Sequence, residues 1–176
     1  MDKDFPVSGF SSLAIHGAHK QDPNYAHLTP IYASSTYVFD TAEQGSRRFS
    51  GAEEGYIYSR WGNPTMAEAE EKIAALETFG LDCKVKGILH ASGMAAITYA
   101  IQTIAEAGDN IVSASALYGG TYNLFAHTLP QYGISVRFAD ARDPQSFSKL
   151  IDNRTKAVYV ESIGNPLGNV ADIAAL

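Results

Sequence analysis

Four segments of the sequence carry residue types that suit the binding of a phosphate and a flat polar ring. The first is Ala91-Ser92-Gly93-Met94, which follows an apolar stretch and opens a helical pattern. A strand that passes through Ser-Gly into a helix presents free backbone N–H groups and the positive end of the helix dipole, which favours a phosphate. Gly93 would let the anion approach closely. Small residues at such a turn also serve simple packing, so this motif alone leaves both interpretations open.

Two further segments also follow apolar stretches. One is Leu117-Tyr118-Gly119-Gly120-Thr121, in which the Tyr118 ring could stack on a flat cofactor and its hydroxyl could move a proton. The other contains Glu161 and Asn165, whose carboxylate and amide could orient a polar ring substituent. The alternatives are a surface-loop tyrosine for Tyr118 and an ordinary turn at Gly164-Asn165-Pro166.

The fourth segment, Tyr58-Ser59-Arg60, lies nearer the N-terminus. If this stretch is extended, Tyr58 and Arg60 point to the same side. A tyrosine hydroxyl beside a guanidinium fork suits a phosphate, although a surface arginine beside a core tyrosine is the alternative. Elsewhere the five histidines are scattered, and the sequence has no Cys/His spacing typical of a zinc site and no dinucleotide-type glycine fingerprint.

Regular elements are needed to place these segments, and the periodicity predicts them. Asn63 caps a helix with Pro64 at its first position, and Gly80 ends it. Strand and helix patterns then alternate, which predicts a mostly parallel sheet with flanking helices and ligands beyond the carboxyl ends of its strands. The expected strands are 85–90, 110–113, 134–138 and 157–162, and the later helices are 93–107, 122–132 and 144–151, the last capped by Asp143.

Residues 1–62 differ from the rest of the chain. They are rich in Tyr, Ser, Gly and Pro, lack sustained periodicity and show no pattern that builds a core of their own. We therefore expect an N-terminal arm over 1–62, packed on the rest of the chain or on another subunit, and an incomplete α/β domain over 63–176. Residues 170–176 resemble the first turns of a helix without a stop signal, so we expect the natural protein to continue beyond Leu176.

The composition narrows the classes of function. A net charge of −6 with scattered arginines argues against a nucleic-acid or anionic-membrane surface. No apolar stretch is long enough to span a bilayer, and residues 1–10 lack the pattern of a signal peptide, so we expect a cytoplasmic protein. Cys83 is the single cysteine, which excludes an internal disulfide.

Together the four segments form a recognisable series. Tyr-Ser-Arg-x-x-Asn-Pro-Thr, Ala-Ser-Gly-Met-Ala-Ala, Leu-Tyr-Gly-Gly-Thr and Glu-Ser-Ile-Gly-Asn-Pro occur in this order. The series resembles the pyridoxal-phosphate (PLP) enzymes of cysteine and methionine metabolism, which include cystathionine γ-synthase, cystathionine γ-lyase, methionine γ-lyase and the O-acyl-homoserine sulfhydrylases. The resemblance extends from the region of His16 to Leu176. It implies the incomplete large domain of a PLP enzyme of fold-type I, which is aspartate-aminotransferase-like, with the smaller C-terminal domain absent from this chain.

The resemblance implies that two groups of residues hold the phosphate of PLP. Ser92, Gly93 and Met94 bind it at the helix N-terminus. Tyr58 and Arg60 reach into the neighbouring subunit and grip the phosphate bound there. The implied assembly is a homotetramer, a dimer of dimers in which each dimer shares its active sites.

The other implied roles concern the pyridine ring. Tyr118 stacks on the ring and takes part in proton transfer. Glu161 and Asn165 lie beside the ring, with Asn165 near the phenolic oxygen. The family's Schiff-base lysine, its aspartate on the pyridine nitrogen and its substrate-carboxylate arginine are expected beyond Leu176. None of the chain's own lysines lies in the lysine motif: Lys3, Lys20, Lys72, Lys84, Lys86, Lys149 and Lys156.

Within the family the likeness is strongest to the O-acetyl- and O-succinylhomoserine sulfhydrylases. Methionine γ-lyases usually carry a cysteine where this chain has Gly120. The implied reaction is therefore γ-replacement on an O-acyl-homoserine by sulfide or a thiol, in homocysteine and methionine biosynthesis. A carbon–sulfur lyase and a catalytically dead chain remain open as alternatives.

Overall fold

The computed structural model describes residues 9–176 and divides the chain into two compact units, one ending at Leu89 and one spanning His90–Leu176. Residues 1–8 lie outside the described residues; they belong to the arm predicted over 1–62 and to the stretch without a signal-peptide pattern. Among the described residues, no helix has both the length and the apolar character needed to cross a membrane.

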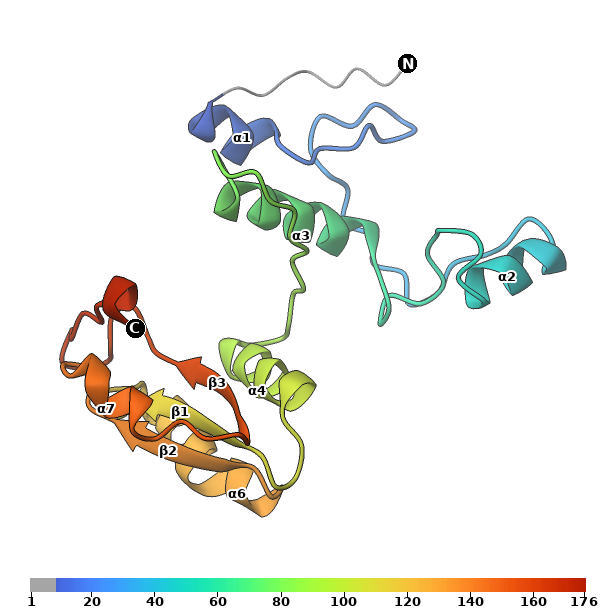
Figure 1. Ribbon diagram of the computed structural model, residues 1–176. Coiled ribbons are helices and arrows are strands. Elements are labelled where there is room, and N and C mark those ends of the chain that lie inside the picture. The colour runs from blue at the N-terminus through green and yellow to red at the C-terminus, as the bar shows by residue number, and fades with distance from the viewer. Residues whose placement is uncertain (1–8) are drawn as a thin grey trace. The chain divides into compact units, whose positions relative to one another are not determined.

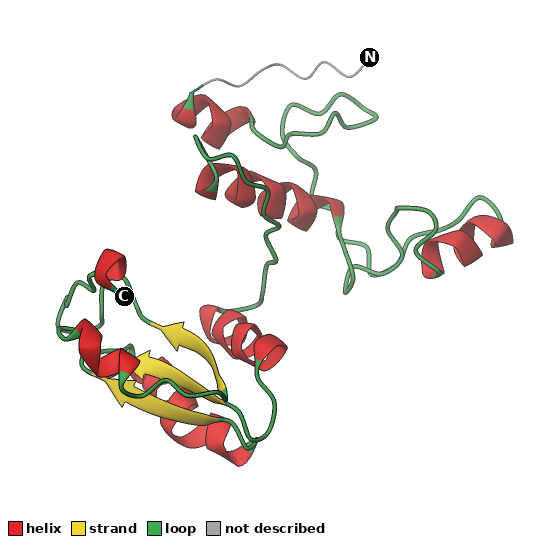
Figure 2. Cartoon of the chain, viewed as in Figure 1, coloured by secondary structure: helices red, strands yellow, loops and turns green. Residues whose placement is uncertain are grey.

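The first unit consists of helices joined by long loops, as Figure 2 shows. Its helices are α1 (Phe10–His16), α2 (Ala42–Phe49) and α3 (Pro64–Glu77). Helix α1 packs on α3, and the ring of Phe10 contacts Phe79 edge-on with 5.4 Å between ring centres. Because of this packing, α3 belongs with the N-terminal residues, and the boundary between the two compact units falls after Leu89.

The start of α3 is as predicted. Asn63 adopts an extended backbone, and its side chain accepts the N–H of Thr65 at 2.9 Å, with Pro64 at the first helical position. Gly80, just after the helix, has a φ of +76°, a conformation that glycine adopts without strain. The other two helices were not predicted. At the start of α2 the N-cap Thr41 accepts the N–H of Gln44, and the Gln44 side chain accepts the N–H of Asp40. This Thr-x-x-Gln pattern is a sequence signal that the long non-periodic arm obscured.

The second unit is a parallel α/β layer, with strands β1 (Asn110–Ala114), β2 (Ser135–Ala139) and β3 (Thr155–Tyr159) in the order β2-β1-β3. Figure 1 shows the three strands side by side, with the helical run that ends in α6 behind them. The predicted parallel sheet with flanking helices is therefore confirmed. Central β1 is buried at all five positions, while β2 and β3 are partly exposed.

Helices precede and connect these strands. Helix α4 (Gly93–Ile104) comes before β1, and a continuous helical run between β1 and β2 comprises α5 (Gly119–Asn123), a π-helical turn (Leu124–Thr128) and α6 (Leu129–Gln131). The widened turn lies just before Pro130, which has no N–H to donate to the preceding turn. Helix α7 (Pro144–Ser148) is capped by the Asp143 side chain, as predicted.

One hydrophobic core, centred on β1 and the helical run behind it, holds the second unit together. Phe125 and Leu129 are fully buried against Ile111 and Val112 of the central strand. Short apolar strands packed on one amphipathic helix explain this arrangement, because each element buries its apolar face only against the other.

Two predicted elements are wrong. Residues 85–90 form no strand, because within the described residues they have no neighbouring strand; instead the N–H of Leu89 donates to Glu70 at 2.7 Å. Residues 170–176 form no regular α-helix: Val170 pairs with Ile163, and only Ile173–Ala175 makes a short 3-10 turn. The helix expected over 93–107 also ends earlier, at Ile104.

Candidate functional site

The loops that follow β1 and β3 meet at the carboxyl edge of the sheet. The two strands are parallel neighbours, so the chain leaves both at the same edge. There the backbone N–H of Tyr118 donates to both carboxylate oxygens of Glu161, at 2.9 and 3.1 Å. A Cβ added to Gly164 would lie 3.0 Å from the carbonyl oxygen of Ala116, so the loops also approach closely along their backbones. The sheet thus brings two predicted site residues into direct contact.

Met94 joins Tyr118 at the start of α5. A Cβ added to Gly120 would lie 2.6 Å from Cε1 of Tyr118 and 3.1 Å from the sulfur of Met94. The ring and the thioether therefore both lie over the bare backbone of Gly120, and any side chain at this position would move the ring. Tyr118 is 50% exposed, which leaves part of its ring free to meet a ligand. In the sequence, Gly120 stood out only because methionine γ-lyases usually carry cysteine at this position. Its close contact with Tyr118 could be recognised only in the three-dimensional structure.

The start of α4 has the features of an anion site. Ser92 is the N-cap, and its hydroxyl accepts the N–H of Ala95 at 3.1 Å, which leaves the earlier amides of the first turn without helical partners. Ser92 and Gly93 are exposed, and a Cβ added to Gly93 would meet nothing within 4 Å. There is room for a phosphate here, and the chemistry of the exposed amides fits one.

Asn165 lies in a compact loop beyond β3. The loop is closed by a hydrogen bond from the Gly164 N–H to the Asn169 carbonyl at 2.7 Å and one from the Ala171 N–H to the Ser162 carbonyl at 3.1 Å. Asn165 itself is exposed and precedes a cis proline. Its amide makes no side-chain hydrogen bond within the described residues, so its predicted role beside the ring stays a prediction.

Beneath the site, Tyr159 ends β3 and packs edge-on against Phe125, with 4.8 Å between ring centres. Burial raises the pKa of the Tyr159 phenol, and the negative charge of Glu161 acts in the same direction. The phenol therefore stays neutral at physiological pH and serves as packing under the carboxylate.

Tyr58 and Arg60 belong to the first unit, and their geometry differs from the extended segment assumed in the sequence analysis. Tyr58 pairs with Thr36 as an isolated bridge, but the chain then turns, because the N–H of Trp61 donates back to the Tyr58 carbonyl at 2.8 Å. The extended premise is thus wrong. The turn still places the Arg60 guanidinium 5.8 Å from the centre of the Tyr58 ring.

Two further aromatic residues hold this pair. The Arg60 guanidinium lies 5.6 Å from the centre of the Trp61 ring, and Phe49 contacts both Tyr58 and Trp61 edge-on at 6.2 and 6.1 Å between ring centres. Rings of this kind attract a guanidinium through their negative faces. Phe49 and Trp61 were not singled out for the site; the run of aromatics near Arg60 was the available signal.

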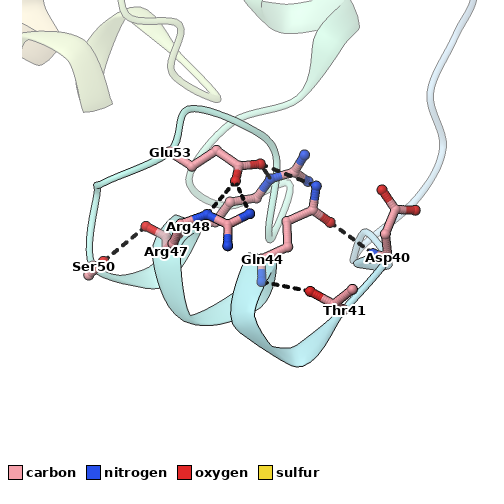
Figure 3. Close-up of polar contacts among 7 residues, drawn as sticks. All are labelled: Asp40, Thr41, Gln44, Arg47, Arg48, Ser50 and Glu53. Carbon is pink, nitrogen blue, oxygen red and sulfur yellow. Dashed lines mark hydrogen bonds and ion pairs between the residues drawn. The ribbon is translucent and has the colours of Figure 1, made fainter.

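Phe49 is the last residue of α2. In the loop that follows, the Glu53 carboxylate binds side chains of that helix and holds the loop against it. Figure 3 shows Glu53 between Arg47, Arg48 and Gln44. Glu53 accepts from Nε of Arg47 at 2.9 Å and from Nε of Arg48 at 3.2 Å. The Arg47 contact, with support from Arg48 and Gln44, holds the pKa of Glu53 below its usual value. A Cβ added to Gly55 would lie 2.5 Å from Nε of Arg48, so the returning loop passes close to this guanidinium.

Comparison with known proteins identifies relatives over almost the whole chain. The sequence profile of the Cys/Met metabolism PLP-dependent enzymes matches residues 11–176. A homocysteine synthase of Schizosaccharomyces pombe is 48% identical over 164 residues, which cover 93% of this chain and 37% of the relative. An L-methionine gamma-lyase of Treponema denticola is 44% identical over 174 residues, which cover 99% of this chain and 42% of the relative. The chain thus spans well under half the length of these relatives.

The structure has matching neighbours as well. One neighbour is a Campylobacter jejuni protein described as an O-acetylhomoserine (thiol)-lyase and solved with N'-pyridoxyl-lysine-5'-monophosphate. It superimposes with a TM-score of 0.87 at 40% identity, over 93% of this chain and 39% of that one. A cystathionine gamma-lyase of Lactobacillus plantarum, solved with L-serine, gives a TM-score of 0.81 at 36% identity, over 95% of this chain and 40% of that one. The sequence identities of 40% and 36% are higher than a shared fold alone would give.

Proposed function

The chain belongs to the family of Cys/Met metabolism PLP-dependent enzymes, and we propose that it is the N-terminal part of one that performs γ-replacement on an O-acyl-homoserine. In this reaction sulfide or a thiol takes the place of the acyloxy group, which leaves as a carboxylate. The product with sulfide is homocysteine. The observation that carries the proposal is the meeting of Tyr118 and Met94 over Gly120 at the strand ends, where Glu161 binds the Tyr118 N–H.

We assign the phosphate of PLP to the start of α4. The exposed first-turn amides after Ser92 offer hydrogen-bond donors, and the open space at Gly93 lets an anion approach the backbone. Met94 lines the side of this site that faces Tyr118 over Gly120. When bound, PLP supplies an electron sink for bonds to the substrate's α-carbon.

Tyr118 is the residue we propose for ring stacking and proton transfer. Its ring is half exposed and its position over Gly120 is fixed by close contact, so a flat ligand ring can meet it at little entropic cost. Its phenol can carry a proton between substrate and solvent. Glu161 and Asn165 complete the ring side of the site, with Asn165 near the phenolic oxygen of the cofactor.

Tyr58 and Arg60 are proposed to grip the phosphate bound to a neighbouring subunit. Arg60 is exposed, and the rings of Tyr58 and Trp61 hold its guanidinium by cation–π contact without using its N–H donors. Within residues 9–176 no hydrogen bond or ion pair uses those donors, so they can bind an anion. We propose a cytoplasmic homotetramer, a dimer of dimers. In it the N-terminal arm over 1–62 contacts the neighbouring subunit, and residues 63–176 form part of the PLP-binding large domain.

A carbon–sulfur lyase is the second candidate, because relatives include L-methionine gamma-lyases. Gly120 favours replacement over lysis, because methionine γ-lyases usually have cysteine there, and a side chain at 120 would collide with Tyr118 as it lies in this chain. Assays of the full-length protein with O-acetylhomoserine, O-succinylhomoserine and methionine separate the two. Faster turnover of methionine than of both esters would overturn the replacement proposal.

The cross-subunit role of Arg60 has a direct test in mixed dimers of the full-length protein. One partner carries Arg60→Ala, and the other carries a substitution of the Schiff-base lysine that we place beyond Leu176. Each heterodimer then has one site with both defects and one intact site, so activity should reappear on mixing. Arg60→Ala alone should weaken PLP binding by roughly ten- to a hundredfold, the value of one charge-assisted phosphate contact.

Arg142→Ala is the matched control, since Arg142 is an exposed arginine of the second unit whose ion pair, among the described residues, is with Asp140. It should leave PLP affinity unchanged. If verified heterodimers show no activity above that of the two parents, Arg60 does not act across the subunit boundary.

We also propose that the 176-residue chain alone is catalytically inactive, because none of its lysines lies in the lysine motif of the family. Incubation with PLP, reduction with borohydride and peptide mapping should find no single preferred lysine. Stoichiometric labelling of one lysine together with turnover would contradict this.

A further inference from the structure

The backbone of Tyr118 is fixed on both sides of its Cα atom. Its N–H donates to both oxygens of Glu161, at 2.9 and 3.1 Å, and its carbonyl accepts the N–H of Tyr122 at 2.9 Å. The second contact is an ordinary turn of α5. The hydrogen bonds of the N–H are made by a residue 43 positions later in the sequence, in the loop after β3, which is the parallel neighbour of β1.

The contact to Glu161 is the stronger of the two. A hydrogen bond to a carboxylate is about twice as strong as one between neutral groups. The side chain reaches Tyr118 because β1 and β3 are adjacent and parallel, and because the loop after β3 approaches the loop after β1 along its backbone at Gly164 and Ala116. The loop is anchored before Tyr118, because Leu117 is buried in the core and the Ser115 N–H donates to the Ala139 carbonyl at 2.9 Å, whereas Tyr118 and Gly119 are exposed.

The direction of the Tyr118 side chain follows from this backbone. With the N–H and the carbonyl both held, the Cα–Cβ bond has one orientation, and the ring then lies over Gly120 beside the sulfur of Met94. Loss of the Glu161 contact frees φ of Tyr118, and the ring loses its register with Met94.

We infer that Glu161 is a positioning residue, whose carboxylate holds the backbone N–H of Tyr118 and thereby aims the Tyr118 ring. This deepens the proposed function, on which it rests, because it explains how a half-exposed tyrosine in a loop keeps one orientation. In this role Glu161 acts on the cofactor through Tyr118 and its polar contact is to the protein backbone.

Hydrogen exchange of the Tyr118 amide in the full-length protein without PLP tests the contact itself, with fragmentation that resolves single amides. Glu161→Ala should speed exchange of this amide by roughly ten- to a hundredfold, since a charge-assisted bond is lost. Glu161→Gln keeps one carbonyl acceptor and should restore most of the protection. Ser162→Ala, at an exposed neighbour in the same loop, is the control and should change nothing. Unchanged exchange of the Tyr118 amide in Glu161→Ala would overturn the inference whatever the protein's activity.

A double-mutant cycle on PLP affinity tests whether Glu161 acts through Tyr118. Glu161→Ala should weaken PLP binding by roughly tenfold when Tyr118 is present and by much less in a Tyr118→Ala background, because coupled residues are non-additive. An equal loss in both backgrounds would mean that Glu161 acts on the cofactor directly, and the positioning role would fall. If Tyr118→Ala leaves PLP affinity unchanged, the proposed stacking fails, and the exchange result alone decides whether Glu161 holds the loop.

Discussion

In the second unit the largest fully buried side chains are Phe125, Ile111 and Leu129, whereas in the first unit the buried side chains include the polar Asp22, Asn63 and Glu68. The second unit is organised by apolar contact around a strand. The first is organised by hydrogen bonds: Nδ2 of Asn63 lies 2.8 Å from the Tyr32 carbonyl and 2.9 Å from Oγ of Ser59.

The apolar side chains of the first unit lie mostly at its surface. Val38 is 93% exposed and Ile31 86% exposed, and Tyr25 and Leu28 are nearly as open. Scattered apolar residues at a surface need no explanation, but several in one small unit with little core of its own are consistent with the subunit contact that we propose for this part of the chain. The second unit thus has an interior of its own, whereas the first presents most of its large apolar side chains outward.

The largest effect we expect is association of the 176-residue chain. Val158 on the edge strand β3 is 44% exposed, and the outer edge of β3 is unpaired within the described residues. This edge can pair with another chain, in addition to any association through the exposed apolar side chains of the first unit. The chain should form oligomers or aggregates at micromolar concentration, as seen by light scattering. A monodisperse monomer with one sharp calorimetric transition would contradict this difference between the units, since the first unit would then be stable without a covering partner.

Phe125→Ala should give the next largest effect and should act on the second unit. Phe125 is 0% exposed and packs on Tyr159, so its removal leaves a cavity in the core. We expect a loss of about 3–5 kcal/mol, measured by hydrogen exchange of the β1 amides. Val38→Ala is the counterpart in the first unit and should leave exchange there almost unchanged in the isolated chain. A loss at Val38 of similar size would show a hidden apolar core.

Asn63→Ala should destabilise the first unit by about 1–2 kcal/mol, through loss of a helix cap and of its hydrogen-bond donors. Exchange of the first amides of α3 and the fluorescence of Trp61, the only tryptophan, report the change. Asn63→Asp keeps the acceptor for the Thr65 N–H but loses the Nδ2 donors, so it separates capping from the contacts to Tyr32 and Ser59. Equal effects of the two variants would assign the whole loss to the donors.

The smallest effect concerns pH. The Asn110 side chain, the Arg154 N–H and the Arg137 guanidinium hold the pKa of Asp152 far below its usual range. A carboxylate whose pKa is lowered on folding adds stability above its unfolded pKa of about 4, and this is lost as pH falls toward the folded pKa. Asp152→Asn should therefore lower the denaturation midpoint of the second unit at pH 7, and the difference from the unsubstituted chain should shrink below about pH 4. A difference that is constant with pH would mean that the charge of Asp152 is not what stabilises the fold.

Glu53→Gln is the counterpart in the first unit, since the Arg47 hydrogen bond lowers the pKa of that carboxyl. Its pH-dependent effect should appear in the exchange of α2 and leave the second unit unchanged. Transfer of the effect to the second unit would show coupling between the two units.

Local signals in the sequence were sufficient for much of the second unit and for one helix of the first. Asn63-Pro64 marks the start of α3, Asp143 caps α7, and the strand predicted over 110–113 falls in the buried strand β1. These succeed because capping and burial depend on a few neighbouring side chains. The strand expected over 85–90 failed for the opposite reason, since a strand exists only with a partner, which its own residues cannot supply.

The candidate site divides in the same way. The residue types at each strand end can be read from the sequence alone, and their motifs identified the family and the candidates Ser92, Tyr118 and Glu161. The three-dimensional fold was needed to find that Glu161 binds the Tyr118 N–H, that Met94 and Tyr118 share the space over Gly120, and that the Arg60 guanidinium lies on two rings. Residue type sets what chemistry a side chain can do, but the distance between residues far apart in the sequence follows from strand order and register, which are properties of the packed sheet.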